Sequence, residues 1–212
     1  MALLSVLPGR PSRLCVLVHQ RGPSYGEGAW SLPGTFIHVG ETLDRAALRA
    51  LRTKVGVQGE SPRQLRVFDD PARDDRGWVM SVAHVDLVPY ARVEHVLGPT
   101  CLLAPVEGEP PAAVVAGRPG GLLFDHDAIV AEAVRWARAA YADQPDPMHV
   151  LGEEFTLYQL QMLHEAVLGR RLTKDTWRRF MTSPERGLLR ETGRTYQGSV
   201  GKPARLFRRT AR

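Results

Sequence analysis

Apolar residues over the first 145 positions follow two different periods, which predict strands and helices in turn. Short runs rich in β-branched and other apolar residues predict strands at 13–19, 34–38, 64–68 and 79–88. Between the second and third runs, apolar side chains recur at helical spacing over 42–55, where Thr42 is suited to cap the helix start and Gly56 its end. A second helical pattern covers 125–141. This order of elements predicts a mixed sheet with flanking helices.

Two stretches rich in proline and glycine interrupt these patterns. Residues 107–121 are dense in both and predict a long loop within the first domain. The sequence Gln-Pro-Asp-Pro-Met at 144–148 follows the second helix, and two prolines so close together stop a helix and stiffen a connection. We therefore place a linker at 142–152 and expect two domains, over 1–145 and 146–212.

Two further helices are predicted after the linker. Thr156, with Gln159 three residues later, has the spacing of a capping box, and apolar side chains recur at helical spacing from there to Gly169. Thr173 is suited to cap a second helix over 174–182. The apolar stripe of this second helix consists of Trp177, Phe180 and Met181. Its polar face consists of Lys174, Thr176, Arg178 and Arg179.

A hairpin is predicted at the end of the chain. Two strand-like segments, 188–192 and 204–209, are separated by a glycine-rich stretch that carries Arg194, Tyr196 and Lys202. Helices followed by a glycine-rich basic hairpin are typical of a winged helix-turn-helix. The expected fold class is therefore α+β, with a mixed sheet and flanking helices followed by a winged helix domain.

Charge is unevenly divided along the chain. The formal net charge is +5. Residues 1–148 carry 15 Lys and Arg against 17 Asp and Glu, whereas residues 149–212 carry 13 against 6. A cationic module joined to a near-neutral one favours a polyanion partner, although a basic tail that is merely solvated has the same composition. The predicted winged helix favours double-stranded DNA as that partner.

Hydropathy and cysteine content exclude several other classes of protein. The apolar runs are short and broken, so we expect no transmembrane helix, and the N-terminal segment lacks the basic residues that begin a secretory signal. Cys15 and Cys101 are the two cysteines, without metal-ligand spacing, and we expect buried free thiols. These features predict a cytoplasmic protein without a metal or another cofactor.

The segment from Trp30 to Val57 resembles a Nudix box, G-x5-E-x7-R-E-U-x-E-E-x-G-U, in which U is bulky and apolar. The residues that match are Glu41, Arg49, Leu51, Gly56 and Val57. Thr35 stands at the first glycine of the pattern, and the three later glutamate positions are occupied by Ala50, Thr53 and Lys54. The resemblance implies a Nudix fold in which three of the four box carboxylates are missing.

These replacements change the chemistry that the box supports. In Nudix hydrolases the box carboxylates hold a divalent metal against a pyrophosphate, and a hard cation needs such oxygen ligands. With Glu41 as the remaining box carboxylate, we expect a pocket that binds its ligand without cutting it. Lys54 with Arg49 then takes over the neutralising role of the metal, or Lys54 points into solvent. Glu41 is left to fix Arg49 or the loop. Trp30 either stacks on an adenine or packs in the core.

A second stretch, 68–84, is similar to the D-P-x-R-D-x-R-G-x-x-x-S-V-A-Y/H pattern of Nudix-related transcriptional regulators. Its charged residues are Asp70, Arg73, Asp74 and Arg76. They are suited to hold the hydroxyls and phosphates of a ligand, or else they neutralise one another in a surface turn. The expected ligand-binding residues are Trp30, Glu41, Arg49, Lys54, Asp70, Arg73 and Arg76.

The predicted winged helix supplies the candidate DNA contacts. Arg178 and Arg179 are candidates to read bases, because a guanidinium fork matches the acceptors of guanine. Lys174 and Thr176 are candidates for either base or phosphate. Contacts with the DNA backbone are expected from the hairpin residues Arg194, Lys202, Arg205 and Arg208, and Tyr196 is a further expected DNA-binding residue.

Together the two domains resemble the NrtR family of Nudix-related regulators. The resemblance implies a homodimeric repressor of NAD biosynthesis genes that binds an operator and responds to ADP-ribose. An alternative is a pyrophosphohydrolase acting on ADP-ribose or a related nucleoside diphosphate, with metal ligands recruited from Asp70, Asp74 and Asp75. A third possibility is an adaptor whose winged helix binds a protein.

Overall fold

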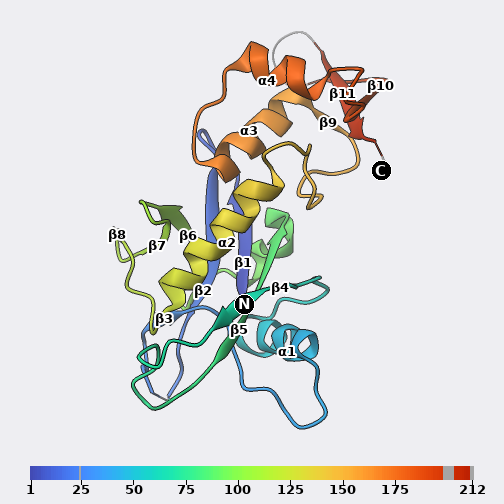
Figure 1. The fold of residues 1–212 in the computed structure, drawn as a ribbon. Coiled ribbons are helices and arrows are strands. Elements are labelled where there is room, and N and C mark those ends of the chain that lie inside the picture. The colour runs from blue at the N-terminus through green and yellow to red at the C-terminus, as the bar shows by residue number, and fades with distance from the viewer. Residues whose placement is uncertain (24, 198–202, 211–212) are drawn as a thin grey trace.

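The computed structural model describes residues 1–23, 25–197 and 203–210, and Figure 1 shows a sheet-rich lower part below a smaller helical and hairpin part. The strands of the larger sheet are β1 (Ala2–Leu7), β2 (Arg13–Gln20), β3 (Trp30–Ser31), β4 (Arg63–Phe68), β5 (Ser81–Val88), β6 (Cys101–Glu107), β7 (Ala112–Val115) and β8 (Arg118–Pro119). The α-helices are α1 (Leu43–Val55), α2 (His126–Ala140), α3 (Leu157–Leu168) and α4 (Lys174–Met181). The 3-10 turns are η1 (Tyr90–Arg92) and η2 (Glu94–Val96).

The larger sheet is mixed, as predicted. Its order is β4-β5-β1-β2-β6-β7-β8, with β3 paired to β2. Strands β1 and β5 run parallel, and the other pairs are antiparallel. Successive side chains of β1 point to opposite faces of the sheet and enter two separate cores. Leu3 lies in one core with Leu51 and Val55 of α1. Ala2 and Leu4 lie in the other core, which contains the inner face of α2. Helices α1 and α2 therefore cover opposite faces of the sheet.

Helix ends follow the predicted capping signals with one exception. The side chain of Thr42 accepts a hydrogen bond from Arg45 N, and Gly56 ends α1 in the left-handed region at φ 73°. The capping box of Thr156 and Gln159 is present at the start of α3. Thr173 stands at the N-cap of α4, but its side chain makes no capping hydrogen bond.

Two predicted elements in the first domain are wrong. Residues 34–38 form a loop whose Phe36 and Ile37 side chains are exposed, and the Phe36 carbonyl bonds to Arg49 instead of a neighbouring strand. Residues 107–121 are not one long loop, because β7 and β8 form a small hairpin that extends the sheet from β6. Proline is tolerated there since Pro119 lies in an edge strand. Strands β1 and β6 were not predicted.

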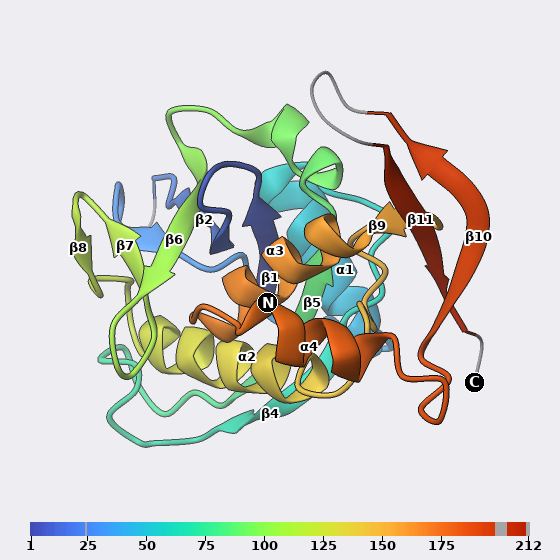
Figure 2. The same ribbon diagram turned by 90° about the horizontal axis from the view of Figure 1, so that it is seen from above.

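The C-terminal part has the predicted winged helix topology. Strands β9 (Phe155–Thr156), β10 (Leu189–Tyr196) and β11 (Ala204–Arg209) form a sheet in the order β10-β11-β9. Figure 2 shows the hairpin of β10 and β11 standing at the edge of the molecule. A small core lies beneath it, made of Phe155, Leu160, Trp177, Met181, Leu188 and Phe207.

The two parts also share a core. Leu163 and Val167 of α3 belong to the same buried cluster as the inner face of α2. Within the predicted linker, Asp146 is fully buried and bonded to both sides, so this segment is packed and does not hang free. Cys15 and Cys101 are buried free thiols as expected, and burial raises the pKa of Cys15 to about 11. Over the described ranges, no helix has the length and hydropathy to cross a bilayer.

Candidate functional site

The Nudix-box segment is organised around one ion pair, between Glu41 just before α1 and Arg49 in the middle of that helix. Arg49 Nε and Nη2 donate to the two oxygens of Glu41, at 2.8 and 2.7 Å. The remaining donors of Arg49 reach Thr35 Oγ1 at 3.0 Å and Phe36 O at 2.8 Å. The Arg49 guanidinium and the His38 N–H lower the pKa of Glu41 to about 2. Glu41 therefore fixes Arg49 and the loop, which is one of the roles expected from the sequence.

The other box positions offer no carboxylate. Ala50 is buried, and Thr53 Oγ1 donates back to Arg49 O at 2.8 Å within the helix. Lys54 is exposed and has no ion pair within the described part of the chain. In that same part no group of three His, Cys, Asp or Glu side chains is placed to hold a metal ion. The divalent metal of Nudix hydrolases needs several oxygen ligands, and this donor set does not fit it.

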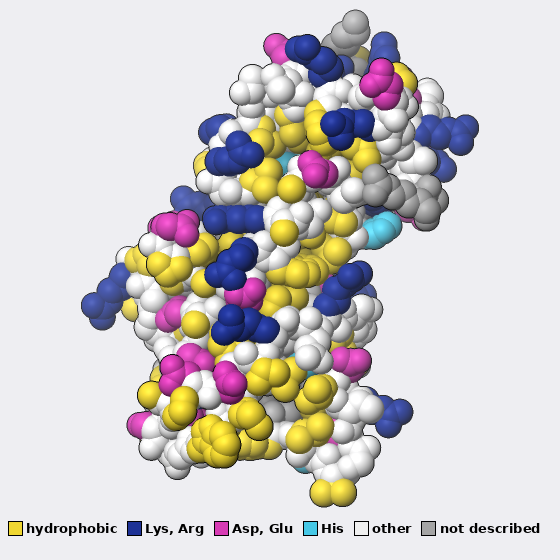
Figure 3. All heavy atoms as spheres, viewed as in Figure 1, with side chains coloured by type: hydrophobic (Ala, Val, Ile, Leu, Met, Phe, Trp, Pro, Cys, Tyr) yellow, Lys and Arg dark blue, Asp and Glu magenta, His cyan; other side chains and the backbone are white. Residues whose placement is uncertain are grey.

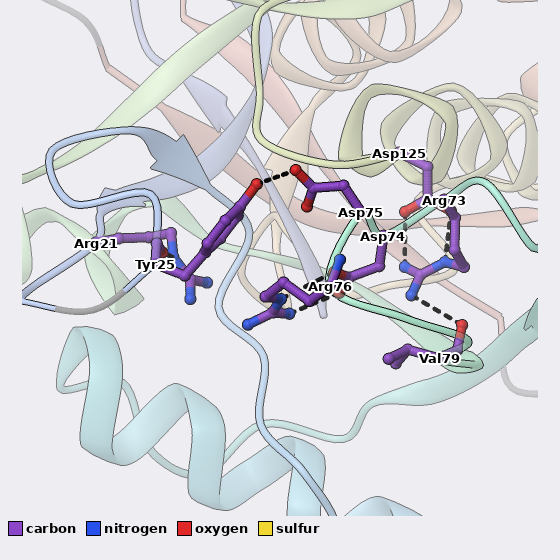
Figure 4. A network of polar contacts seen from close by, with 8 residues as sticks. All are labelled: Arg21, Tyr25, Arg73, Asp74, Asp75, Arg76, Val79 and Asp125. Carbon is purple, nitrogen blue, oxygen red and sulfur yellow. Dashed lines mark hydrogen bonds and ion pairs between the residues drawn. The ribbon is translucent and has the colours of Figure 1, made fainter.

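The charged loop after β4 is largely neutralised by ion pairs (Figure 4). Arg76 Nε and Nη2 bind the two oxygens of Asp74 at 2.8 and 2.6 Å, which lowers the pKa of Asp74 to about 2. Arg73 is nearly buried and binds Asp125, just before α2, at 2.8 and 2.6 Å. Asp70 Oδ1 accepts the Ala72 N–H within the turn. The self-neutralised alternative thus describes the loop, except that the partner of Arg73 comes from another element.

A hollow lies beside this loop, and two aromatic rings pack against Arg76 of the same loop. The hollow has a volume of about 540 Å³ and is lined by Arg66, Phe68, Asp69, Asp70, Pro71 and Asp125. Tyr25 stacks on Phe124 with ring centres 6.0 Å apart, and Arg76 lies 5.1 and 4.8 Å from the two ring centres. The sequence gives no signal for this cluster, because its members are distant in sequence and carry no motif. Trp30 packs half-buried against the main core, as the packing alternative expects.

Two histidines, His19 in β2 and His126 in α2, were also not predicted as part of the site. His19 Nδ1 donates to Gln20 O at 3.0 Å, which leaves Nε2 to accept from Ser31 Oγ at 3.4 Å. Burial, with the nearby charge of Lys54 contributing, lowers the pKa of His19. His126 Nδ1 accepts the Leu32 N–H at 3.0 Å, and burial lowers the pKa of His126 to about 3. Both imidazoles are neutral at pH 7, so they offer polar contacts without charge.

The predicted DNA-binding helix has the expected polarity. Trp177 and Met181 are buried, and Phe180 is half-buried against the same core. The exposed face of α4 carries Lys174, Thr176, Arg178 and Arg179. Figure 3 shows Lys and Arg side chains over the winged helix end of the molecule. An exposed basic helix of this kind has the shape and charge to enter a DNA groove.

The hairpin arginines are engaged in ion pairs more than expected. Arg194 and Arg208 each bind Glu154 at 3.0 Å, and Arg205 binds Glu191 at 3.2 Å. Tyr196 is exposed. Lys202 lies outside the described residues. The structure therefore brings Arg194 and Arg208 together at one carboxylate, away from the residues of the Nudix box.

Comparison with known proteins identifies both parts. The NUDIX domain model matches residues 3–138, and the NrtR DNA-binding winged helix domain model matches residues 147–209. The chain is 27% identical over 210 residues to the ADPR responsive transcriptional repressor NtrR of Acinetobacter baylyi, covering 98% of this chain and 79% of that protein. It is 27% identical over 121 residues to an ADP-ribose pyrophosphatase of Methanocaldococcus jannaschii, covering 57% and 66%.

Structural similarity extends over nearly the whole chain. The crystal structure of Shewanella oneidensis NrtR complexed with a 27mer DNA has a TM-score of 0.75 and 26% identity, covering 99% of this chain and 92% of that one. The chain therefore belongs to the Nudix family and joins its Nudix domain to a DNA-binding winged helix domain of the NrtR type.

Proposed function

We propose that this chain is a transcriptional repressor of NAD biosynthesis genes whose Nudix domain binds ADP-ribose and thereby weakens operator binding. It acts in the cytoplasm as a homodimer, with its two recognition helices about 34 Å or a multiple of that distance apart on a two-fold operator. The observation that carries the proposal is the joining of a basic winged helix to a Nudix domain without its metal-binding carboxylates. Similarity to an ADPR responsive repressor supports the choice of effector.

In this proposal the exposed face of α4 enters the major groove. Arg178 and Arg179 read bases, while Lys174 and Thr176 contact bases or phosphates. The hairpin contacts the DNA backbone through Arg194, Tyr196, Lys202 and Arg205. Each Lys or Arg that contacts a phosphate releases counterions from the DNA, so operator affinity falls steeply as the salt concentration rises.

The effector binds at the box face and the charged loop. Arg49 is held by Glu41, Thr35 and Phe36, so we assign the diphosphate contact to Lys54, an exposed cation at a former glutamate position of the box. Trp30, Asp70, Arg73 and Arg76 border or support the ligand, with Arg73 and Arg76 held by carboxylates. Binding of this kind needs no Mg²⁺, since an ammonium group supplies the neutralising charge.

A DNA titration tests the proposed repressor. DNA from upstream of the chain's own gene is labelled and titrated with protein, with and without ADP-ribose. We expect specific binding that ADP-ribose weakens, and an Arg178→Ala change that costs about 1–3 kcal/mol on the specific site. Arg135→Gln, an exposed arginine on α2, serves as the matched control. Equal affinity for random duplex contradicts the proposed repressor.

Chelation and substitution test the metal-free effector site. ADP-ribose affinity is measured with Mg²⁺ and with EDTA, and we expect the two values to agree. Lys54→Gln is expected to weaken ADP-ribose binding by about 1.5–3 kcal/mol, the net contribution of a hydrogen bond between charged groups. Arg118→Gln, which removes an exposed charge elsewhere in the same domain, is the control. Affinity that vanishes with EDTA rejects this mode of binding.

The second candidate function is ADP-ribose pyrophosphohydrolysis, favoured by similarity to an enzyme of that activity. It requires metal ligands from outside the box, such as Asp70, Asp74 and Asp75. Asp74 is already bound to Arg76, and Asp75 accepts a hydrogen bond from Tyr25. Release of AMP and ribose 5-phosphate with Mg²⁺ is the measurement that supports the enzyme, whereas binding without turnover supports the repressor.

A further inference from the structure

The first turn of α2 is fixed by residues of the candidate effector site. Asp125, which precedes the helix, binds Arg73 of the charged loop through two hydrogen bonds of 2.8 and 2.6 Å. His126, the first residue of the helix, accepts the Leu32 N–H at 3.0 Å, just before the Nudix-box loop. A change in the position of either segment therefore acts on the start of α2 through these hydrogen bonds.

The far end of α2 is fixed to the DNA-binding helix. Tyr141, which caps the helix, is fully buried and its ring centre lies 5.5 Å from that of His164 in α3. His164 in turn lies 5.5 Å from the ring of Trp177 in α4, again edge to face. Trp177 is the buried residue between the exposed Thr176 and Arg178. The basic face of α4 is thus two aromatic contacts away from α2.

The same tyrosine is tied to the hairpin. Tyr141 Oη donates to Asp146 Oδ1 at 2.7 Å, and Arg209 of β11 donates to Asp146 Oδ2, also at 2.7 Å. Asp146 accepts the Val150 and Leu151 N–H groups as well, so its carboxylate is held by four donors. Tyr141 is therefore connected to both elements that face DNA.

One continuous helix joins these two ends. Helix α2 has 15 residues, about 22 Å of axis, and runs from the sheet-rich part to the winged helix in Figure 1. Non-glycine residues in the left-handed region flank it, Phe124 at φ 61° and Asp146 at φ 54°. Such backbone conformations cost energy and persist where the surrounding contacts enforce them.

We propose that α2 transmits occupancy of the Nudix site to the DNA-binding elements, with Tyr141 as the residue that positions both α4 and the hairpin. This inference rests on the proposed function for the identity of the two ligands. A ligand that changes the contacts of Arg73 or of the Leu32 segment shifts α2, and Tyr141 passes that shift to His164, Trp177 and Asp146. The ligand acts because it favours one position of the helix over the other.

Coupling between two ligands tests the role of Tyr141. Tyr141→Phe keeps the ring contact with His164 and removes the hydrogen bond to Asp146. We measure the dissociation constant of upstream DNA with and without ADP-ribose, and the reciprocal change in ADP-ribose affinity with and without DNA, which must be the same factor. We expect the factor to fall about 3- to 10-fold, while ADP-ribose affinity without DNA changes less than about 2-fold. Arg135→Gln, in the middle of α2, leaves the factor unchanged.

A second measurement needs neither ligand. Arg73→Gln removes the ion pair with Asp125 at the opposite end of α2, and amide hydrogen exchange is followed by mass spectrometry. We expect exchange in α4 and in β10 and β11 to quicken at least 3-fold, with no such change in Arg135→Gln. Unchanged exchange in α4 overturns the inference, as does a Tyr141→Phe protein that keeps full coupling. A wild-type protein that binds neither ligand refutes the proposed function, and the exchange result still decides the inference.

Discussion

Glu154 restrains two arginines of the hairpin, and its removal is expected to strengthen DNA binding. Its carboxylate lies 3.0 Å from both Arg194 and Arg208, whose side chains are 73% and 53% exposed. Each guanidinium has to leave this carboxylate, or share it, in order to contact a phosphate. Glu154→Gln removes the charge and keeps the shape of the side chain. The freed arginines then contact phosphates without that competition.

The size of the effect follows from the exposure of the two pairs. Exposed ion pairs contribute about 0.2–1 kcal/mol each, so the loss of two raises DNA affinity about 2- to 30-fold. If both guanidiniums gain a phosphate, the slope of log K against log salt steepens by up to about 1.8 per protomer. Between 50 and 200 mM salt this adds roughly a tenfold loss of affinity per protomer.

Fluorescence anisotropy with labelled upstream DNA, titrated at several salt concentrations, measures both quantities. Glu153→Gln is the matched control, because Glu153 is the exposed neighbour in the chain and has no ion pair with any described residue. Thermal unfolding of both variants confirms that they are folded. If Glu154→Gln binds no more tightly than Glu153→Gln, with the same salt slope, then Arg194 and Arg208 do not contact DNA.

Two further predictions concern stability. Asp146→Ala is expected to lower the free energy of unfolding by about 3–5 kcal/mol, because it leaves the nearly buried Arg209 without its carboxylate. Urea denaturation measures this change, and a loss below about 1 kcal/mol contradicts the prediction. Burial lowers the pKa of His164 to about 4, so the unfolded chain takes up a proton between pH 6.5 and 4 that the folded chain does not, and stability falls by about 3 kcal/mol over that range. His164→Leu is expected to remove this part of the acid dependence, and an unchanged pH profile of unfolding is the contrary result.

Local signals made the helices and the winged helix predictable. Thr42 and Gly56 bound α1, and Thr156 with Gln159 begins α3, because capping depends on residues within one turn. The hairpin of β10 and β11 was predictable from two strand-like segments around a glycine-rich stretch. The strand predicted at 34–38 failed because Arg49, eleven or more residues away, takes the Phe36 carbonyl. A pattern of neighbouring residues cannot indicate that a distant side chain takes a backbone hydrogen bond.

The sequence by itself determined the family, the two kinds of domain and the absence of carboxylates from three Nudix-box positions, because motif spacing and residue identity are properties of the chain. Only the tertiary structure decided how those residues are used. It paired Arg49 with Glu41 and Arg73 with Asp125. It also paired Arg194 and Arg208 of the hairpin with Glu154. It also joined α2 to α4 through Tyr141. Ion pairs and ring contacts depend on distances in space between residues far apart in sequence, and folding alone sets those distances.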